Sequence, residues 1–156
     1  MPPQLISGNI NALDPNELKI ILQEAGITRL DTAAHYMNGE SEKVLGKARF
    51  PETFHIDTKI KLELPGDGSL SAKAIDRSLT NSLNVLVVEK VNVLYCHAPD
   101  FKTPVAEQAR AFNEHYEKGR FSQVSITLDH SICSSLMDSS WACQTSQPLW
   151  SKNGSR

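Results

Sequence analysis

The sequence predicts an α/β fold of parallel strands and crossover helices, corresponding to the N-terminal part of a (β/α)8 TIM barrel. Short apolar runs alternate with segments of helical periodicity, as expected for successive βα units. A doubly wound sheet fits that alternation too. However, the G-x-G-x-x-G pattern expected after its first strand is absent, because Gly8 is followed by Asn9 and Ile10. This absence favours the barrel.

Five segments have the composition of strands, and most of these apolar runs end in polar residues at the carboxyl end. They are residues 4–10, 28–33, 54–60, 91–97 and 121–127. The carboxyl ends of the strands of a parallel barrel lie on one face, and that face carries the active site. We therefore expect the polar residues at these strand ends to lie near one another.

Four segments between the strands have helical periodicity, namely residues 14–26, 39–48, 71–86 and 103–119. In the first, Asp14 is the expected N-cap and Pro15 the first helical residue. Its expected apolar face consists of Leu18, Ile21, Leu22 and Ala25.

The third helical segment carries its apolar residues in one stripe, formed by Ile75, Leu79, Leu83 and Leu86. In the fourth, Thr103 is the expected N-cap, Pro104 the first helical residue and Gly119 the C-terminal cap.

Composition bounds the class of protein. The chain has 156 residues, 40% of them hydrophobic, and a formal net charge of −2, which suits one soluble globular domain. Such a charge provides no general attraction to nucleic acid or to an anionic membrane, so we expect neither as a partner. No apolar run reaches the roughly 18 residues of a membrane span, and the N-terminus lacks the pattern of a secretory signal. Three cysteines without a framework spacing favour a reducing, cytoplasmic location.

The composition changes near Asp129. We therefore predict a βα domain over residues 1–128 and a Ser-rich, disordered tail over residues 129–156. His130, Cys133 and Cys143 in this tail lack the paired spacing of structural zinc ligands, and we expect no metal site.

Three motifs carry a family resemblance. DTAAHYMNGESEKVLGKA begins at Asp31, FHIDTKI contains Lys59, and LYCHAPDFKTPVAEQARAFNEHYEKGRF contains His97. In this order and spacing the chain resembles the aldo-keto reductases over about residues 4–124, with most similarity to the aflatoxin-aldehyde reductase branch. That family consists of (β/α)8 barrels that transfer hydride from NADPH to aldehydes and ketones.

The resemblance implies roles for four side chains at the strand ends. Tyr36 matches the tyrosine that donates a proton to the carbonyl oxygen, and Lys59 matches the lysine that favours its phenolate. Asp31 matches the carboxylate that partners this lysine, and His97 matches the histidine that orients the substrate. An ammonium beside a phenol stabilises the phenolate, which is the physical reason for such a pair.

The resemblance also implies that Gly8, Asn9 and Asp31 line the cofactor cleft. Next to the expected catalytic residues, Cys96 is interpreted as a core residue and His35 as a residue of the rim. Taken singly, each of the four catalytic candidates is more often a packed, solvated or capping residue. Their joint placement in three motifs favours the catalytic interpretation.

The chain departs from the family at two places. Asn92 stands where the family usually has Asp, a change expected to be mild. After GRFSQ the family continues into a strand ending Gly-Leu/Val-Ser-Asn, whereas this chain continues VSITLDHSI and has no counterpart of the later βα units.

A complete barrel takes about 250 residues, so four to five βα units leave it open. We therefore expect an NADPH-dependent reductase of small carbonyl substrates, impaired by the missing half. The alternative is an inactive truncated isoform that at most associates with a full-length relative. Self-association through the open half-barrel face is a further expectation.

Overall fold

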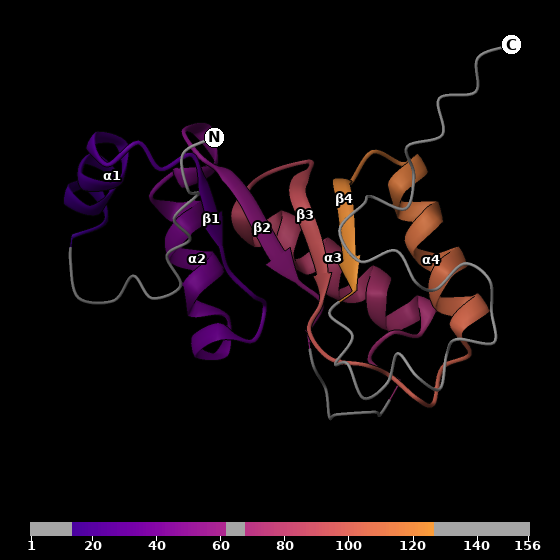
Figure 1. The fold of residues 1–156 in the computed structure, drawn as a ribbon. Helices are drawn as coiled ribbons and strands as arrows, with labels where there is room; N and C mark the ends of the chain where they lie inside the picture. The colour runs from indigo at the N-terminus through magenta and orange to yellow at the C-terminus, as the bar shows by residue number, and fades with distance from the viewer. Residues whose placement is uncertain (1–13, 62–67, 127–156) are drawn as a thin grey trace, which may run out of the picture.

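The computed structural model describes residues 14–61 and 68–126 (Figure 1). The helices are α1 (Pro15–Glu24), α2 (Glu40–Lys47), α3 (Ala72–Leu86) and α4 (Val105–Glu117), with short 3-10 turns η1 (Tyr36–Gly39) and η2 (Phe50–Glu52). The strands are β1 (Arg29–Asp31), β2 (His55–Lys59), β3 (Val91–Cys96) and β4 (Phe121–Ile126). The expected first strand over residues 4–10 and the tail over residues 129–156 lie outside the described residues.

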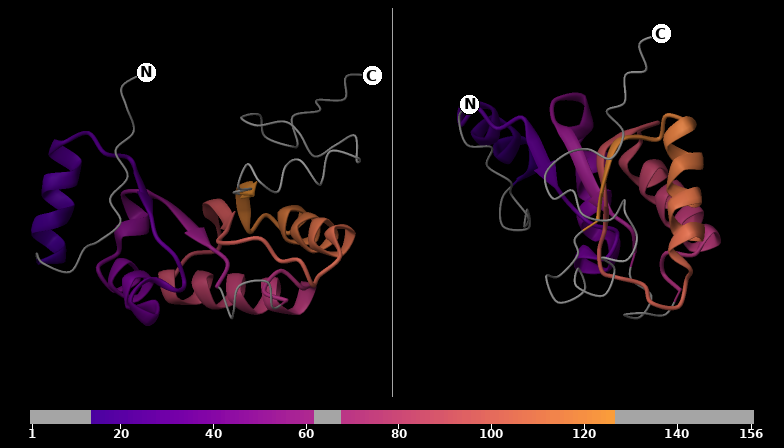
Figure 2. Two further views of the ribbon diagram at one scale, coloured as in Figure 1. Left: turned by 60° about the horizontal axis from the view of Figure 1, so that its bottom comes forward. Right: turned by 45° about the vertical axis from the view of Figure 1, so that its right-hand side comes forward.

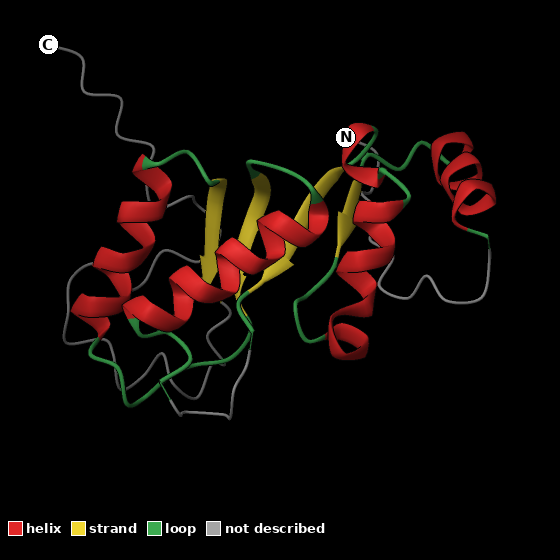
Figure 3. Cartoon of the chain, turned by 180° about the vertical axis from the view of Figure 1, so that it is seen from behind, coloured by secondary structure: helices red, strands yellow, loops and turns green. Residues whose placement is uncertain are grey.

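The strands form one sheet in the order β1-β2-β3-β4, and every neighbouring pair is parallel. This sequential order is that of a barrel wall, whereas a doubly wound sheet reverses its order at a switch point. Helices α2, α3 and α4 lie behind the sheet in Figure 1 and in front of it in Figure 3. Figure 2 gives the same one-sided arrangement from two other directions. The fold is therefore α/β with part of a (β/α) barrel, as predicted.

The hydrophobic core lies between the sheet and the helices that cover it. Leu30 of β1, Ile56 of β2 and Leu94 of β3 are each at most 4% exposed and belong to one buried cluster. Helix α3 closes this cluster with the predicted stripe, all of it buried: Ile75, Leu79, Leu83 and Leu86. Burying a side chain of this size stabilises the fold by about 1.5–3 kcal/mol, so the stripe fixes α3 against the strands.

Helix α1 begins as the sequence predicts but packs through a narrower face. The Asp14 carboxylate accepts from the backbone N–H groups of Asn16 (2.9 Å) and Glu17 (3.3 Å), which makes it the N-cap. Leu18 and Leu22 are buried, but Ile21 is 51% exposed and Ala25 is exposed, contrary to expectation. The reason is positional, because α1 lies beyond the β1 edge of the sheet (Figure 1) and only one stripe of it reaches the core.

The predicted N-cap at Thr103 is wrong. Helix α4 begins at Val105 with Pro104 in the cap position, and the Thr103 hydroxyl instead donates to the Asp100 carboxylate (2.7 Å). This charge-assisted hydrogen bond orients the Thr103 side chain toward Asp100, and Pro104, predicted as the first helical residue, is the residue before the helix. At the other end Gly119 has φ +70, the left-handed conformation in which glycine ends a helix, as predicted.

Within residues 14–61 and 68–126, no helix combines the length and apolar character needed to cross a membrane.

Candidate active site

The strand register assigns the residues of β1, β2 and β3 to two faces of the sheet. Thr58 donates its hydroxyl to Glu42 of α2 (2.6 Å), so Thr58 points toward the helices. Side chains alternate along a strand, so Lys59 points to the opposite, inner face. Asp57, two residues before Lys59, points to the inner face as well. Lys59 is paired with Tyr95 and Asp57 is paired with Asp31 in the parallel strands, so all four side chains share that inner face.

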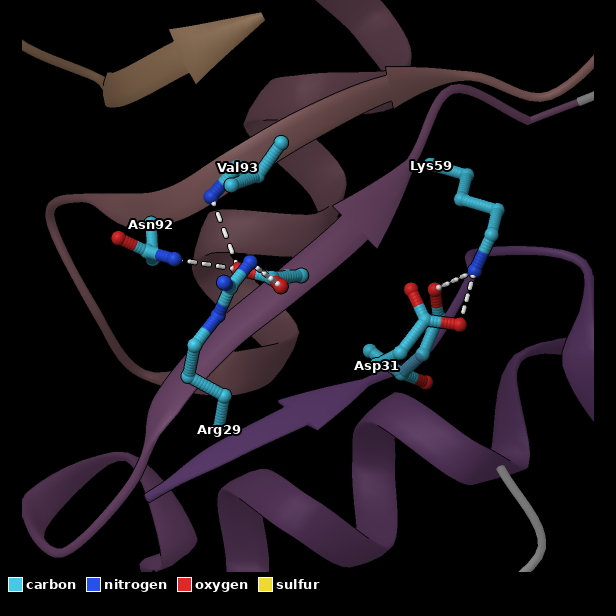
Figure 4. A network of polar contacts seen from close by, with 7 residues as sticks. Arg29, Asp31, Lys59, Asn92 and Val93 are labelled. Atoms are coloured by element: carbon cyan, nitrogen blue, oxygen red, sulfur yellow. Dashed lines mark hydrogen bonds and ion pairs between the residues drawn. The ribbon is translucent and has the colours of Figure 1, made fainter. Parts of the chain in front are cut away.

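Lys59 is fixed at the carboxyl end of β1. Its Nζ donates to Oδ2 of Asp31 (2.5 Å) and to the backbone oxygen of Thr32 (2.9 Å), as Figure 4 shows. Thr32 is itself held, since its N–H donates to the backbone oxygen of Asp57 (2.9 Å). The side chains of Lys59 and Asp31 remain 16% and 20% exposed. The ammonium is thus anchored without being sealed from solvent.

Two aromatic rings from neighbouring loops complete the cluster. Nζ of Lys59 lies 4.8 Å from the centroid of the Tyr36 ring, within the range of a cation–π contact. The rings of Tyr36 and His97 meet edge to face, with centroids 6.0 Å apart and an interplanar angle of 85°. The structure therefore brings together Asp31 at the end of β1, Tyr36 of η1, Lys59 at the end of β2 and His97 directly after β3.

His97 is held in its neutral form near pH 7. Burial lowers the pKa of its imidazole, and the positive charge of Lys59 and the neighbouring His35 lower it further, against a smaller opposing effect of Asp31. The His35 ring lies 6.2 Å from that of His97 at an angle of 83°. Nδ1 of His97 is buried and has no hydrogen-bond partner in the described part of the chain. A buried polar atom of this kind is expected to serve a bound molecule or water.

Tyr36 leads directly into an unusual backbone segment. Met37 (φ 53), Asn38 (φ 56) and Gly39 (φ 89) are three consecutive residues with positive φ. A left-handed conformation costs an ordinary L-residue roughly 1–2 kcal/mol, and such strain concentrates at functional sites. Only Gly39 gives a sequence-level indication of this turn, so the segment was not predicted.

Sequence reasoning missed Tyr95, whose ring centroid lies 5.6 Å from Nζ of Lys59. Its position two residues before His97 was the available indication, since alternate strand residues share a face. Cys96, the residue between them, is 2% exposed, and burial raises its thiol pKa to about 12. It is an inert core residue, in agreement with its interpretation from the sequence. Exposed His35 lies beside the cluster.

Several sequence-predicted residues lie outside the described part of the chain. These are the expected cofactor residues Gly8 and Asn9 and the tail residues His130, Cys133 and Cys143. Their expected roles stay predictions.

Comparison with known proteins identifies the family. The family model described as "Aldo/keto reductase family" matches residues 10–142, most of the chain. The match extends past the domain boundary at residue 128 that composition suggests, and that boundary stays a prediction.

Three curated relatives illustrate the similarity. A probable voltage-gated potassium channel subunit beta of Oryza sativa subsp. japonica is 34% identical over 90% of this chain and 42% of its own length. A protein of the same name from Arabidopsis thaliana is 40% identical over 70% of this chain and 36% of its own length. Aflatoxin B1 aldehyde reductase member 2 of Rattus norvegicus is 34% identical over 67% of this chain and 29% of its own length.

The chain thus spans well under half the length of these relatives. The family model and the relatives that cover two thirds or more of the chain agree with the resemblance seen in its motifs. The chain belongs to the aldo/keto reductase family.

Proposed function

We propose that this chain carries the catalytic side chains of an NADPH-dependent carbonyl reductase acting on a small aldehyde or ketone. The observation that carries the proposal is the position of the Lys59 ammonium, bonded to Asp31 and 4.8 Å from the centroid of the Tyr36 ring. Membership of the aldo/keto reductase family and similarity to aflatoxin B1 aldehyde reductases support an oxidoreductase.

In this proposal Tyr36 is the general acid, which gives its phenolic proton to the carbonyl oxygen as negative charge develops there. Lys59 favours the resulting phenolate electrostatically, since its ammonium lies beside the Tyr36 ring. Asp31 holds the ammonium in this position through its hydrogen bond. The proton therefore moves to the substrate from a side chain whose anion is stabilised in place.

His97 is proposed to orient the carbonyl group. A neutral imidazole has one N–H donor and one acceptor nitrogen, and burial favours that neutral form here. A donor placed beside Tyr36 stabilises charge on the same oxygen that receives the proton. The lack of a partner for buried Nδ1 among the described residues supports a ring with hydrogen-bonding capacity left for a ligand.

We propose NADPH as the cofactor, which membership of the aldo/keto reductase family supports. The part-exposed Asp31 side chain and the unsatisfied Nδ1 of His97 are polar groups that a bound molecule could contact. When bound, NADPH supplies the hydride for the carbonyl carbon. We propose that Gly8, Asn9 and Asp31 line its cleft.

The test is a titration of the purified chain with NADPH, followed by an aldehyde screen that monitors oxidation of the cofactor. We expect saturable binding and weak, impaired turnover. We expect Tyr36→Phe to lower kcat by roughly 10²–10⁴-fold without loss of binding, because it removes the general acid alone. Tyr116→Phe on α4 is the matched control, since that ring contacts Phe121 rather than the site. Parent-like turnover by Tyr36→Phe would refute the assignment, and absence of binding would refute the function for this chain.

A second candidate function is association without turnover. Two relatives are named as probable potassium channel β subunits, which favours a role in binding another polypeptide. For this chain we propose self-association through the inner face of the sheet, in a cytoplasmic setting. Sedimentation with and without NADPH measures the association, and the aldehyde screen measures turnover. A binding subunit is expected to assemble in the first experiment and to show no carbonyl turnover in the second.

A further inference from the structure

Lys59 contacts two tyrosine rings, and the proposed mechanism uses only one of them. Its Nζ lies 4.8 Å from the centroid of the Tyr36 ring and 5.6 Å from that of Tyr95. Lys59 and Tyr95 are register partners on β2 and β3, so their backbones are fixed side by side. The contact with Tyr95 is thus part of the sheet, whereas Tyr36 comes from a turn.

Tyr95 is itself tied to the interior of the sheet. The hydrogen bond to Asp57 raises the pKa of Arg29 against the lowering effect of burial, and a hydrogen bond with Tyr95 adds a smaller increase. Arg29 is in turn anchored by that bond, which joins Nη2 to Oδ2 at 2.6 Å. The ring therefore has a fixed neighbour on the side of β1 as well as its own backbone on β3.

Tyr95 is also a poor candidate for the proton donor. Burial raises the pKa of its phenol, and the negative charge of Asp57 adds to this. Arg29 and Lys59 lower the pKa and Asp31 raises it, each by a smaller amount. A phenol in this environment stays protonated at neutral pH and gives up its proton reluctantly. Tyr95 therefore contributes to the site through the contact of its ring with Lys59, and not through its phenolic proton.

We propose that Tyr95 is a positioning residue, whose ring confines the Lys59 ammonium to the position between Asp31 and Tyr36. This inference rests on the proposed reductase function, which makes that position matter. A lysine side chain has a flexible stem of four carbons, so fixing its ammonium in one position costs considerable rotamer freedom. Asp31 and Thr32 restrain its tip through hydrogen bonds, and the Tyr95 ring restrains it by a face contact.

The decisive experiment is NMR of the chain labelled with carbon-13 in its lysines, which needs neither cofactor nor turnover. Ring currents of Tyr36 and Tyr95 shift the Cε protons of Lys59, whose signal is assigned by its absence in Lys59→Arg. We expect Tyr95→Leu to move this signal toward its free-lysine position and Tyr95→Phe to leave it unmoved. Lys19 is the internal control, because its Nζ lies 5.2 Å from the centroid of Phe50 and should not respond.

An unchanged Lys59 signal in folded Tyr95→Leu overturns the inference. If that variant loses the fold, the unmodified chain decides the matter through a nuclear Overhauser contact between the Lys59 Cε protons and the Tyr95 ring. Observation of the contact supports the inference, and its absence overturns it.

The activity arm uses the same variants. Given turnover, we expect Tyr95→Leu to lower kcat by about two- to fivefold with little change in KM, the factor that one cation–π contact provides. Tyr95→Phe should retain the parent rate, a rescue that loss of bulk packing would not predict. Failure of NADPH binding would refute the proposed function while leaving the NMR result on Lys59 intact, so the two failures are distinguishable.

Discussion

Two ion pairs join β1 to β2 on the same face of the sheet, and their surroundings differ. In the first, Arg29, whose side chain is 25% exposed, holds Asp57, whose side chain is 1% exposed and also accepts from Asn92 (2.7 Å) and the N–H of Val93 (3.1 Å). In the second, Asp31 holds Lys59, with both side chains 16–20% exposed. Figure 4 shows the two pairs next to each other.

The two pairs differ in how many hydrogen bonds surround the carboxylate. The Asp57 carboxylate is saturated by three donors from β1 and β3, so the pair locks three strands together. The Asp31–Lys59 pair lies at the carboxyl ends of its strands, beside the rings of Tyr36 and His97. The two adjacent pairs therefore have similar chemistry but differ in how fully the carboxylate is enclosed: Asp57 is buried, whereas Asp31 keeps contact with solvent.

The strongest test of this contrast replaces each carboxylate in turn. We expect Asp57→Asn to lower the free energy of unfolding by about 3 kcal/mol, because it removes the buried charge that accepts from Arg29, Asn92 and Val93. Asp31→Asn should cost less, about 1 kcal/mol, because both side chains of that pair keep some contact with solvent, while it also disturbs Lys59. Urea unfolding of both variants gives the comparison, and equal losses would show that the two pairs do not differ in this way.

A second prediction tests the surroundings of the Arg29–Asp57 pair alone. The Asn92 amide donates to Asp57, so Asn92→Asp replaces a donor by a second carboxylate beside the first. We expect a loss of roughly 1.5–3 kcal/mol at pH 7, the range for a hydrogen bond to a charged group. Combining it with Asp57→Asn should recover part of the loss, because one of the two like charges is gone. Strictly additive losses in this double-mutant cycle would contradict the contact.

A third prediction concerns Asp100, a carboxylate held by N–H and O–H donors of the two loops before α3 and α4. Its own burial would raise its pKa, but hydrogen bonds from Thr103, Leu70 and Lys102 outweigh this and lower it to about 2. Because the folded pKa lies below the ordinary 3.8, the contribution is complete above about pH 4 and is lost as the pH falls toward 2.

We therefore expect Asp100→Asn to cost about 2 kcal/mol at pH 7 and progressively less below pH 4. Denaturant unfolding at a series of pH values measures this. A penalty that does not change with pH would show that the charge of Asp100 contributes nothing.

The smallest predicted effect has the opposite sign and lies on the helix side of the sheet. Glu42 is 1% exposed and accepts from Thr58 (2.6 Å) and Ser82 (3.1 Å), both hydroxyls. Burial raises its pKa, and the two hydroxyls only partly offset this. A raised folded pKa means that stability is greatest below the unfolded pKa and declines as the pH rises through the folded one.

Glu42→Gln should remove that decline and make the chain more stable than the parent at pH 8, by on the order of 1 kcal/mol. Thermal or denaturant unfolding between pH 5 and pH 8 tests the slope. A parent stability that rises over this range relative to the Gln variant would contradict the assignment.

The sequence alone was sufficient for the fold and for the strand-end residues. Alternating periods fixed the βα order, and the stripe from Ile75 to Leu86 is buried as its spacing predicts. The motifs that resemble the aldo-keto reductases also pointed to Asp31, Tyr36, Lys59 and His97, which the structure places close together, while their catalytic roles stay predictions. Local patterns are readable because side-chain direction follows from the strand and helix periods.

Tertiary structure decided what those local patterns leave open. Ile21 is exposed because α1 lies at a sheet edge, and Thr103 fails as a cap because Asp100 takes its hydroxyl. The contact of Tyr95 with Lys59 and the bond of Asn92 to Asp57 depend on strand register, which pairs residues about 35 positions apart. Register is set by the packing of the whole sheet, so the enclosure of one ion pair and the openness of the other are decided only in three dimensions.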